Sequence, residues 1–322
     1  MEKYYILLYY CYSKIQDPEE FREQHHQLCL DLDLRGRIII ASEGLNGTVS
    51  GSEDACKKYM DAVLSDSRFN HTEFKVDVND TAAFEKLHVR VKPEIVHSSL
   101  HHIDPNQQAG NYVEPEEFRQ ILKEEDEDTV ILDVRSNYEH TIGKFKNAVT
   151  LDIDNFKDFP HKIKELARYK GKKIITYCTG GIKCEKASAY LLEQGFKDVY
   201  QLHGGIIKYG MKAGGEDFEG KCYVFDSRVV KEVNSVNPTI ISTCYVTGKP
   251  CDRMINCANP YCNMHIPMSE EGSAVYNGCC SEECMNNPDA CPYNGTGLYR
   301  KEMNGYNPHK GAKRKVNLHH YL

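Results

Sequence analysis

A cysteine followed by a glycine pair and a lysine is the strongest chemical signal in the chain. Cys178 ends a short apolar run, Gly180 and Gly181 follow it, and Lys183 precedes a stretch with helical character. In a strand–loop–helix turn, loop N–H groups and the positive end of the helix dipole stabilise an anion. The pKa of a cysteine there falls from about 8.5 into the range of roughly 3.5 to 7.5. Cys178 is therefore predicted to be a thiolate nucleophile near neutral pH, with Lys183 adding positive charge.

Two regular elements must position this loop. The β-branched run at 173–178 predicts a strand, and residues 184–192 predict a helix. Between them lies the predicted anion cradle, which consists of Thr179, Gly180, Gly181 and Ile182. The alternative is that Cys178 is a buried residue at a strand end and that the glycines only turn the chain. The agreement of glycines, lysine and helix start favours the nucleophile.

Cys184 lies six residues after Cys178 and has two interpretations. It is a candidate resolving thiol, which would convert a persulfide or sulfenate on Cys178 into a disulfide. Alternatively, it faces the sheet as a small buried hydrophobic residue, and we favour this structural role. Glu185 and Lys186, in the first turn of the same helix, are predicted to lie on the surface.

The composition defines the class of protein. A length of 322 residues predicts two or three domains, each with its own core, and 40% hydrophobic with 27% charged residues is typical of a globular protein. No stretch approaches the roughly 20 apolar residues of a membrane span, and the chain does not start like a signal peptide. A cytoplasmic protein is predicted. In a reducing compartment, 14 cysteines fit metal ligands, a catalytic thiol and core residues better than disulfides.

The first unit is predicted to span residues 1–95. Strands are expected at 4–12, 36–42, 48–50 and 72–78, with helices starting near 18 and 52. This β-α-β-β-α-β order is that of a ferredoxin-like (acylphosphatase-like) α+β domain. Residues 43–47 contain an Asn-Gly pair, which predicts a turn between the second and third strands. Residues 96–112 are expected to be a linker.

Two groups of basic residues are candidates for contact with RNA, although the formal net charge of −7 argues against a protein that coats nucleic acid. One side of an alternating strand carries Lys86, His88, Arg90 and Lys92. This row fits contacts with the phosphates of a nucleic acid, and the alternative is the charged solvent face of an edge strand. The second group is Lys313, Arg314 and Lys315, for which a solvated tail is the alternative.

Residues 214–322 are predicted to form a cysteine-rich, zinc-binding domain. Two cysteine pairs, separated by a loop, have spacings that bring four thiolates to one tetrahedral zinc ion; they are Cys257 and Cys262, and Cys280 and Cys284. A short polar unit with few apolar residues gains folding free energy from a metal. Cys244 and Cys251 are alternative or second-site ligands, and unconnected thiols are the remaining alternative. The chain shows no flavin or nicotinamide motif.

Residues 113–213 resemble a rhodanese domain. The matching motifs are Asp133-Val134-Arg135, Tyr138-Glu139, Gly143-Lys144-Phe145, Asn147-Ala148 and Leu202-His203-Gly204-Gly205-Ile206. The resemblance implies an α/β domain with helices on both faces of a parallel sheet, and the active cysteine in the loop after a central strand. Lys183 stands where a loop of sulfurtransferase size ends; the related phosphatase loop is one residue longer and ends in Arg. Asp133 and Arg135 are predicted to form a structural ion pair beneath the loop.

Nearly the whole chain is similar to the bacterial rhodanese-domain-containing tRNA uridine hydroxylases. The motifs are CTGGIKCEK from Cys178, LHGGI from Leu202, CYVFDSR from Cys222 and NCANPYC from Asn256, in the same order. The resemblance implies an oxidoreductase that uses dioxygen to hydroxylate C5 of the wobble uridine in the tRNA anticodon, with Cys178 as its thiol. One departure is Lys183, where the family commonly has Arg, so the planar guanidinium fork is lost while the charge is kept.

Three hypotheses of function follow. In the hydroxylase, Cys178 or its persulfide would attack C6 of uracil and make C5 nucleophilic, while loop N–H groups stabilise the charge. A rhodanese-type sulfurtransferase with a Cys178 persulfide needs the same thiol and cradle. The flanking units favour the hydroxylase, because a simple sulfur carrier requires neither of them. A tRNA-binding module without catalysis would tolerate loss of the thiol.

Overall fold

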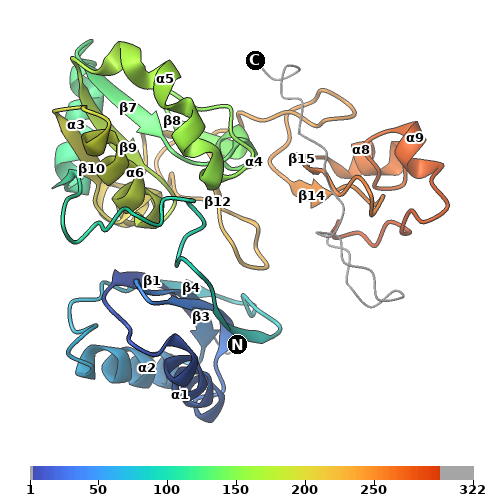
Figure 1. Ribbon diagram of the computed structural model, residues 1–322. Helices are drawn as coiled ribbons and strands as arrows, with labels where there is room; N and C mark the ends of the chain where they lie inside the picture. Colours follow the sequence, from blue (N-terminus) through green and yellow to red (C-terminus); the bar gives the residue numbers. More distant parts are fainter. Residues whose placement is uncertain (1–2, 298–322) are drawn as a thin grey trace.

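The computed structural model describes residues 3–297, which form three parts (Figure 1). In Figure 1 the N-terminal part lies below a larger α/β part, and the small C-terminal part lies to the right. None of the helices within these residues combines the length and hydrophobicity that crossing a membrane requires. The predicted basic group of Lys313, Arg314 and Lys315 lies outside the described residues.

The N-terminal part is a five-stranded sheet in the order β4-β1-β3-β2-β5 with two helices on one face. Its elements are β1 (Tyr4–Tyr12), α1 (Pro18–Asp31), β2 (Arg35–Ala41), β3 (Gly44–Gly51), α2 (Glu53–Ser65), β4 (Lys75–Asn79) and β5 (Leu87–Val91). The first four strands have the predicted ferredoxin-like arrangement, and β5 adds to the edge, parallel to β2. The strand predicted from the alternating basic residues is therefore present as β5, at one edge of the sheet.

The residues at its start explain where helix α1 begins. The alternation of side chains along β1 explains why both faces of this strand are covered. The Asp17 side chain accepts hydrogen bonds from two N–H groups of the first turn of α1 and so caps this helix. Along β1, Leu7 and Tyr9 are fully buried in the core under the helices. Leu8 and Tyr10 point to the opposite face, as the two-residue period of a strand requires. That second face meets the α/β part (Figure 1).

The predicted Asn-Gly turn is wrong. The chain turns at Ser42 and Glu43, and β3 begins at Gly44, so Asn46 and Gly47 pair with β1 inside the sheet. A Cβ atom on Gly44, whose φ is 147°, would lie 2.0 Å from the carbonyl oxygen of Cys11. The close approach of two strands at Gly44 sets the turn, and Asn46 Nδ2 instead donates to the carbonyl oxygen of Ile95 at 2.9 Å.

The α/β part contains a four-stranded parallel sheet in the order β6-β10-β9-β7. Its strands are β6 (Asn111–Val113), β7 (Thr129–Asp133), β9 (Lys173–Tyr177) and β10 (Val199–Leu202). Its α-helices are α3 (Pro115–Glu124), α4 (Asn137–Ile142), α5 (Ile163–Leu166), α6 (Ile182–Glu193) and α7 (Gly205–Ala213), and 3-10 turns occur at Phe156–Lys162 and Ala167–Tyr169. Separate hydrophobic clusters include Ile175 and Ile174, neighbours on β9, so both faces of the sheet are covered as predicted.

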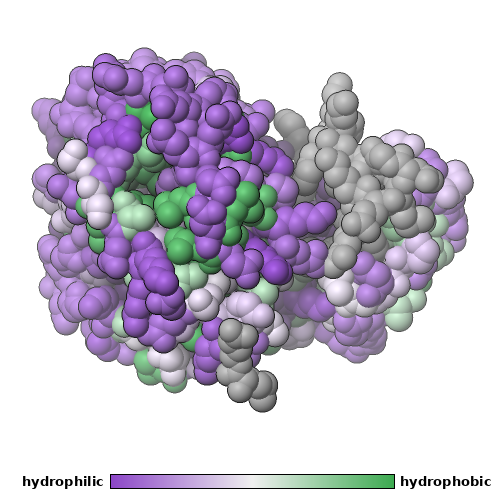
Figure 2. Space-filling view, turned by 90° about the horizontal axis from the view of Figure 1, so that it is seen from below, coloured by the Kyte–Doolittle hydropathy of each residue, from purple (hydrophilic) through white to green (hydrophobic). Residues whose placement is uncertain are grey.

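Short antiparallel pairs of strands follow the parallel sheet and form part of the remaining structure. They are β8 (Gly143–Phe145) with β11 (Phe218–Gly220), β12 (Cys222–Tyr223) with β13 (Val230–Lys231), and β14 (Met254–Asn256) with β15 (His265–Pro267). Helices α8 (Glu270–Val275) and α9 (Glu282–Met285) complete the C-terminal part, whose core is rich in cysteine. Seen from below, the surface of the molecule is largely hydrophilic, with hydrophobic residues gathered near the middle (Figure 2).

A buried lysine joins the N-terminal part to the α/β part. Lys186 of α6 has no exposed surface, and its ammonium donates to Glu43 Oε2 at 2.7 Å. It also donates to the carbonyl oxygens of Ile103 at 2.7 Å and Leu100 at 3.3 Å. Glu185 is likewise buried. The prediction that Glu185 and Lys186 lie on the surface is wrong, because their side of the helix faces protein rather than water.

We expect Lys186→Met to destabilise the protein strongly. The substitution leaves the Glu43 carboxylate and two carbonyl groups without their donor, and breaking a buried ion pair from one side costs about 3 to 5 kcal/mol. Urea unfolding followed by circular dichroism should therefore show a clearly lower midpoint. Lys57→Met is the matched control, because Lys57 pairs with Glu53 on an exposed helix surface. Equal midpoints for the two variants would contradict the role assigned to Lys186.

Candidate active site and metal site

The Cys178 loop connects β9 to α6. The helix begins at Ile182, two residues earlier than predicted, so the loop is shorter and the N-terminus of the helix lies closer to the thiol. Gly181 has a φ of 104°, in the left-handed region that favours glycine, and this conformation turns the chain directly into the helix. The N–H group of Gly181 donates to Cys178 Sγ at 3.2 Å. This part of the predicted anion cradle is present.

The loop makes the Cys178 thiol acidic although the residue is 1% exposed. Burial is the largest influence and raises the pKa, but four other groups outweigh it: the Cys184 thiol as hydrogen-bond donor, the Lys183 charge, and the N–H groups of Lys183 and Gly181. Together they lower the pKa of Cys178 to about 6. The thiol is thus an anion at neutral pH, as a nucleophile must be.

The Cys184 thiol keeps its proton and donates a hydrogen bond to the sulfur of Cys178. It is fully buried, and both burial and the negative charge of Cys178 raise the pKa of Cys184 well above its usual value. Its side chain packs in the hydrophobic cluster that also contains Cys178. These contacts agree with the structural role that we favoured, and a function as resolving thiol stays a prediction.

The ammonium of Lys183 is oriented by a buried carboxylate. Lys183 Nζ forms a short ion pair with Glu139 Oε2, whose side chain is completely buried, and lies 5.6 Å from the centre of the Phe225 ring. The same Glu139 oxygen accepts a hydrogen bond from the N–H group of Ser136 at 3.0 Å. Lys183 is thereby held at the mouth of the loop.

The predicted ion pair beneath the loop is confirmed. Arg135 and Asp133 are fully buried, with Nε to Oδ1 at 2.9 Å and Nη2 to Oδ2 at 2.7 Å. Arg135 also donates to the carbonyl oxygen of Gly143 at 2.6 Å, and the Tyr177 hydroxyl donates to Asp133 Oδ2 at 2.6 Å. Because Tyr177 immediately precedes Cys178, this network fixes the end of the strand that carries the thiol.

The N-terminal sheet forms one wall of the site, which sequence reasoning missed. A Cβ atom on Gly180 would lie 3.0 Å from Leu8 Cδ2, and one on Gly181 would lie 2.9 Å from the Tyr10 hydroxyl. The Tyr10 hydroxyl donates to Glu185 Oε1 at 2.8 Å. The glycine pair therefore leaves room for β1 as well as turning the chain. The tyrosine-rich first strand was the available signal, but only the fold shows what it faces.

Lys75 is a second cation of this wall and was also missed. It is 5% exposed, and its Nζ lies 5.3 Å from the centre of the Tyr10 ring. Within residues 3–297, no carboxylate pairs with this ammonium. Burial lowers the pKa of Lys75, while the negative charges of Glu73 and Cys178 oppose this effect. Positive charge therefore reaches the thiolate from both sides of the domain contact.

The structure brings the four predicted metal ligands together. The sulfur atoms of Cys257, Cys262, Cys280 and Cys284 lie within 4.8 Å of one another, and all four residues are buried. A closed set of four thiols suits a tetrahedral structural metal site. Cys244 is not part of this group; its sulfur accepts hydrogen bonds of 3.4 Å from the N–H groups of Thr247 and Ser269. Cys251 is also outside the group.

The predicted RNA-contact row lies along the free edge of β5. Lys86, Arg90 and Lys92 are exposed and His88 is half-buried. Burial and the neighbouring charges of Arg90, Arg37 and Lys86 lower the pKa of His88, so this edge concentrates positive charge. Arg37 on β2, paired with His88 in the sheet, extends the row and was not predicted.

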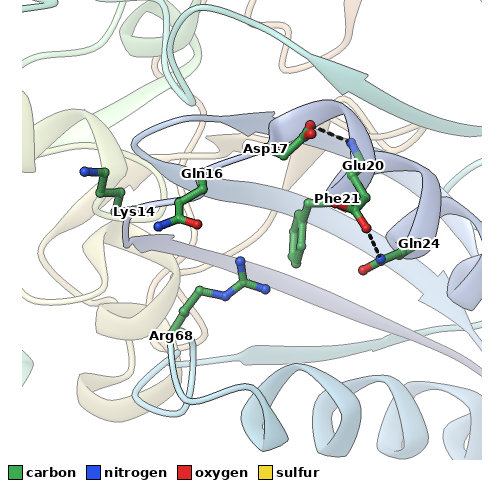
Figure 3. Close-up of a pocket in the computed structure, with 7 residues that line it drawn as sticks. All are labelled: Lys14, Gln16, Asp17, Glu20, Phe21, Gln24 and Arg68. Atoms are coloured by element: carbon green, nitrogen blue, oxygen red, sulfur yellow. Dashed lines mark hydrogen bonds between the residues drawn. The ribbon is translucent and has the colours of Figure 1, made fainter.

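A pocket of about 550 Å³ in the N-terminal part is distinct from this site. It is lined by Lys14, Gln16, Asp17, Glu20, Phe21, Gln24 and Arg68 (Figure 3). Arg68 Cζ lies 4.9 Å from the centre of the Phe21 ring, and Asp66 pairs with the Arg68 guanidinium at 2.6 Å. Because no residue of the Cys178 loop lines it, the pocket is not the predicted active site.

Three family models match successive segments of the chain. They are the UPF0176 acylphosphatase like domain at residues 4–95, the rhodanese-like domain at 114–212 and the rhodanase C-terminal model at 219–285. A rhodanese-like domain from Anabaena, solved by NMR, covers 34% of this chain and 78% of its own, with 25% identity and a TM-score of 0.29. The sheet, the loop and the family matches define a mixed α/β protein with a rhodanese-like domain.

Two relatives extend the match to nearly the whole chain. A tRNA uridine(34) hydroxylase from Cytophaga hutchinsonii is 64% identical over 98% of this chain and 100% of its own. One from Listeria welshimeri is 49% identical over 94% of this chain and 93% of its own. The chain therefore belongs to the tRNA uridine(34) hydroxylase family, as the sequence motifs implied.

The acidity of Cys178 can be measured by the pH dependence of its alkylation. With iodoacetamide and mass spectrometry of the Cys178 peptide, we expect the rate to rise with pH and to reach half its maximum near pH 6. Lys183→Met removes a positive charge that stabilises the thiolate, so its midpoint should move upward by about one unit. Lys57→Met, remote from the loop, should leave it unchanged. A midpoint for Lys183→Met equal to that of the wild type would contradict the charge assignment.

Proposed function

We propose that the protein is an oxidoreductase that hydroxylates C5 of the wobble uridine of tRNA, with dioxygen as the source of oxygen. One observation carries the proposal: the chain is 64% identical, over 98% of its length, to a relative named tRNA uridine(34) hydroxylase. The buried Cys178 thiol, to which the Gly181 N–H group donates, is the nucleophile that we assign to it. We assign residues 113–213 as the catalytic domain, 1–95 as a tRNA-contact domain, 96–112 as the linker and 214–322 as the zinc-binding domain. The cytoplasm, which contains tRNA, is the proposed site of action.

The proposed first step is addition of the Cys178 thiolate to C6 of the target uracil. The electron pair of the C5–C6 double bond then moves toward C5 and the O4 carbonyl, which makes C5 nucleophilic. Loop N–H groups that now hold the thiolate, such as that of Gly181, and the ammonium of Lys183 would stabilise negative charge during addition and release of the base. In the oxygenation, one oxygen atom of dioxygen would become the hydroxyl group on C5 and the other would leave as water, which consumes two electrons and two protons from an external reductant. Loss of the proton on C5 and departure of the Cys178 thiolate would then restore the C5–C6 double bond.

We propose that tRNA binds across the N-terminal edge strand through its anticodon region. The contact residues are Lys86, His88, Arg90 and Lys92, supported by the exposure of the three strong cations. Phosphate contacts of this kind supply affinity without sequence specificity. The basic group near the end of the chain, Lys313, Arg314 and Lys315, is proposed as a second contact on sequence grounds alone.

We propose that the four clustered cysteines bind one structural zinc ion. Four thiolates are a common zinc ligand set, and a fully occupied tetrahedral site leaves no position for substrate. The C-terminal core consists largely of these and other cysteines with a few methionine and isoleucine side chains. Such a small core gains much of its stability from the metal.

The nucleoside content of tRNA tests the enzymatic proposal. In cells that lack the protein we expect 5-hydroxyuridine and its derivatives to disappear, and wild type but not Cys178→Ser to restore them. Cys291→Ser, which alters a thiol in the C-terminal part, should restore them like the wild type. Mass spectrometry of digested tRNA measures the hydroxylated and the thiolated nucleosides in one experiment. A change in thiolated nucleosides instead would support the sulfurtransferase, and restoration by Cys178→Ser would refute catalysis by this thiol.

Removal of the metal should unfold the C-terminal part. We expect the purified protein to carry about one zinc per chain by elemental mass spectrometry. Cys262→Ser should lose most of this metal and make the C-terminal part susceptible to limited proteolysis, because metal binding supplies folding free energy there. Cys291→Ser, outside the four-sulfur cluster, should keep the metal and the protease resistance. Full zinc content in Cys262→Ser would overturn the ligand assignment.

A further inference from the structure

An exposed aromatic side chain lies beside the Cys178 loop. Phe225 is 45% exposed and lies between β12 and β13, within the hairpin 222–231. The carbonyl oxygen of Tyr223 in this hairpin accepts a hydrogen bond of 3.3 Å from Thr179 Oγ1, so the hairpin contacts the loop directly. A single exposed hydrophobic residue is ordinary on a protein surface, and it is the surroundings of Phe225 that distinguish it.

Two cations flank Phe225. Lys183 Nζ lies 5.6 Å from the ring centre, and Arg37 Nη1 donates to the Phe225 carbonyl oxygen at 3.4 Å. Arg37 is exposed and neighbours His88 of the basic row. We call Arg37, Lys183, Tyr223 and Phe225 the Phe225 surface. These residues connect the N-terminal sheet with the Cys178 loop, because Arg37 belongs to β2 and Lys183 to the first turn of α6.

The hairpin that carries Phe225 is fixed before any ligand binds. The N–H group of Ser227 donates to the carbonyl oxygen of Ala83 at 2.9 Å, and Lys231 pairs with Asp77 at 2.5 Å. Arg228 forms a further short ion pair with Asp77. Both Ala83 and Asp77 belong to the N-terminal part. A side chain held in this way loses little conformational entropy on binding.

Aromatic neighbours support the base of this surface. The Tyr223 ring lies 5.2 Å from Phe225 and 5.0 Å from Tyr138, with edge-on geometry in both pairs. His265 of the C-terminal part lies 5.5 Å from Tyr223. Tyr138, Tyr223 and His265 are half-buried, whereas Phe225 is exposed. The row therefore presents one aromatic side chain to solvent on a packed support.

We propose that Phe225 is the platform on which an unpaired base of the tRNA anticodon loop stacks, next to the target uridine. Arg37 would contact the adjoining phosphate. Single-stranded RNA is recognised by aromatic side chains for the bases and cations for the backbone, and the Phe225 surface combines both. The exposed Arg37 and the basic row beside it favour this polyanionic ligand over an apolar peptide. The inference rests on the proposed function, because the target uridine must reach Cys178.

Substitutions at Phe225 test stacking separately from hydrophobicity. Stacking contributes about 1 to 3 kcal/mol per base, so Phe225→Leu, which stays apolar but cannot stack, should raise KM for tRNA at least about fivefold. Phe225→Trp should retain a KM close to that of the wild type. In a second readout, an anticodon stem–loop with 2-aminopurine beside the target uridine should lose fluorescence on binding wild type or Phe225→Trp, and much less on binding Phe225→Leu.

Two controls separate this inference from a structural effect and from the proposed function. The alkylation rate of Cys178 at pH 7 should change little in the Phe225 variants, because each of them keeps the Lys183 charge and the N–H groups of Lys183 and Gly181 that stabilise the thiolate. For Arg37→Gln, the slope of the log binding constant for tRNA against log salt concentration should be smaller in magnitude by about one. If wild type hydroxylates tRNA but Phe225→Leu matches it in KM and fluorescence, only the stacking inference fails. If wild type does not hydroxylate tRNA, the proposed function fails, and quenching by wild type and Phe225→Trp but not by Phe225→Leu would still support stacking.

Discussion

Keeping a sulfur anion charged out of water is the constraint on which the rest of this structure depends. Burial of Cys178 alone would hold its thiol protonated. The loop offsets that cost with backbone N–H groups, the Lys183 ammonium and the thiol of Cys184. Each of these requires support: the backbone needs the left-handed conformation of Gly181, and Lys183 needs the buried Glu139. An acidic thiol is therefore a property of the whole domain rather than of one residue.

Charges buried between domains extend the same principle outward. Lys186 occupies the contact between α6 and the N-terminal part, and the neighbouring Glu185 accepts hydrogen bonds from Tyr10 and Tyr112. An ion in such a position is costly unless each of its partners is in place, so these contacts define one relative placement of the two parts. That placement sets Leu8 and Tyr10 against the loop. The contacts that hold the two parts together are therefore also the contacts that place β1 against the Cys178 loop.

Structural features that depend on short stretches of sequence could be predicted. The strand–loop–helix signal at Cys178, the spacing of the four cysteines and the alternation of the basic strand each depend on neighbouring residues, and the structure contains all three arrangements. Tyr10, Lys75 and the burial of Lys186 were not predictable, because they depend on contacts such as that between Tyr10 and Glu185, 175 residues apart. The Asn46 turn failed for a related reason: a close strand contact at Gly44 outweighed a local turn preference.

The fit of two glycines against β1 has a consequence for evolution. A side chain on Gly180 or Gly181 would press against Leu8 or Tyr10, which lie 3.0 and 2.9 Å from the position of the added Cβ atom. The α/β part is therefore fitted to the N-terminal sheet and is not an interchangeable module. A substitution in either segment has to fit the other, so the loop and the first strand are constrained to change together during evolution.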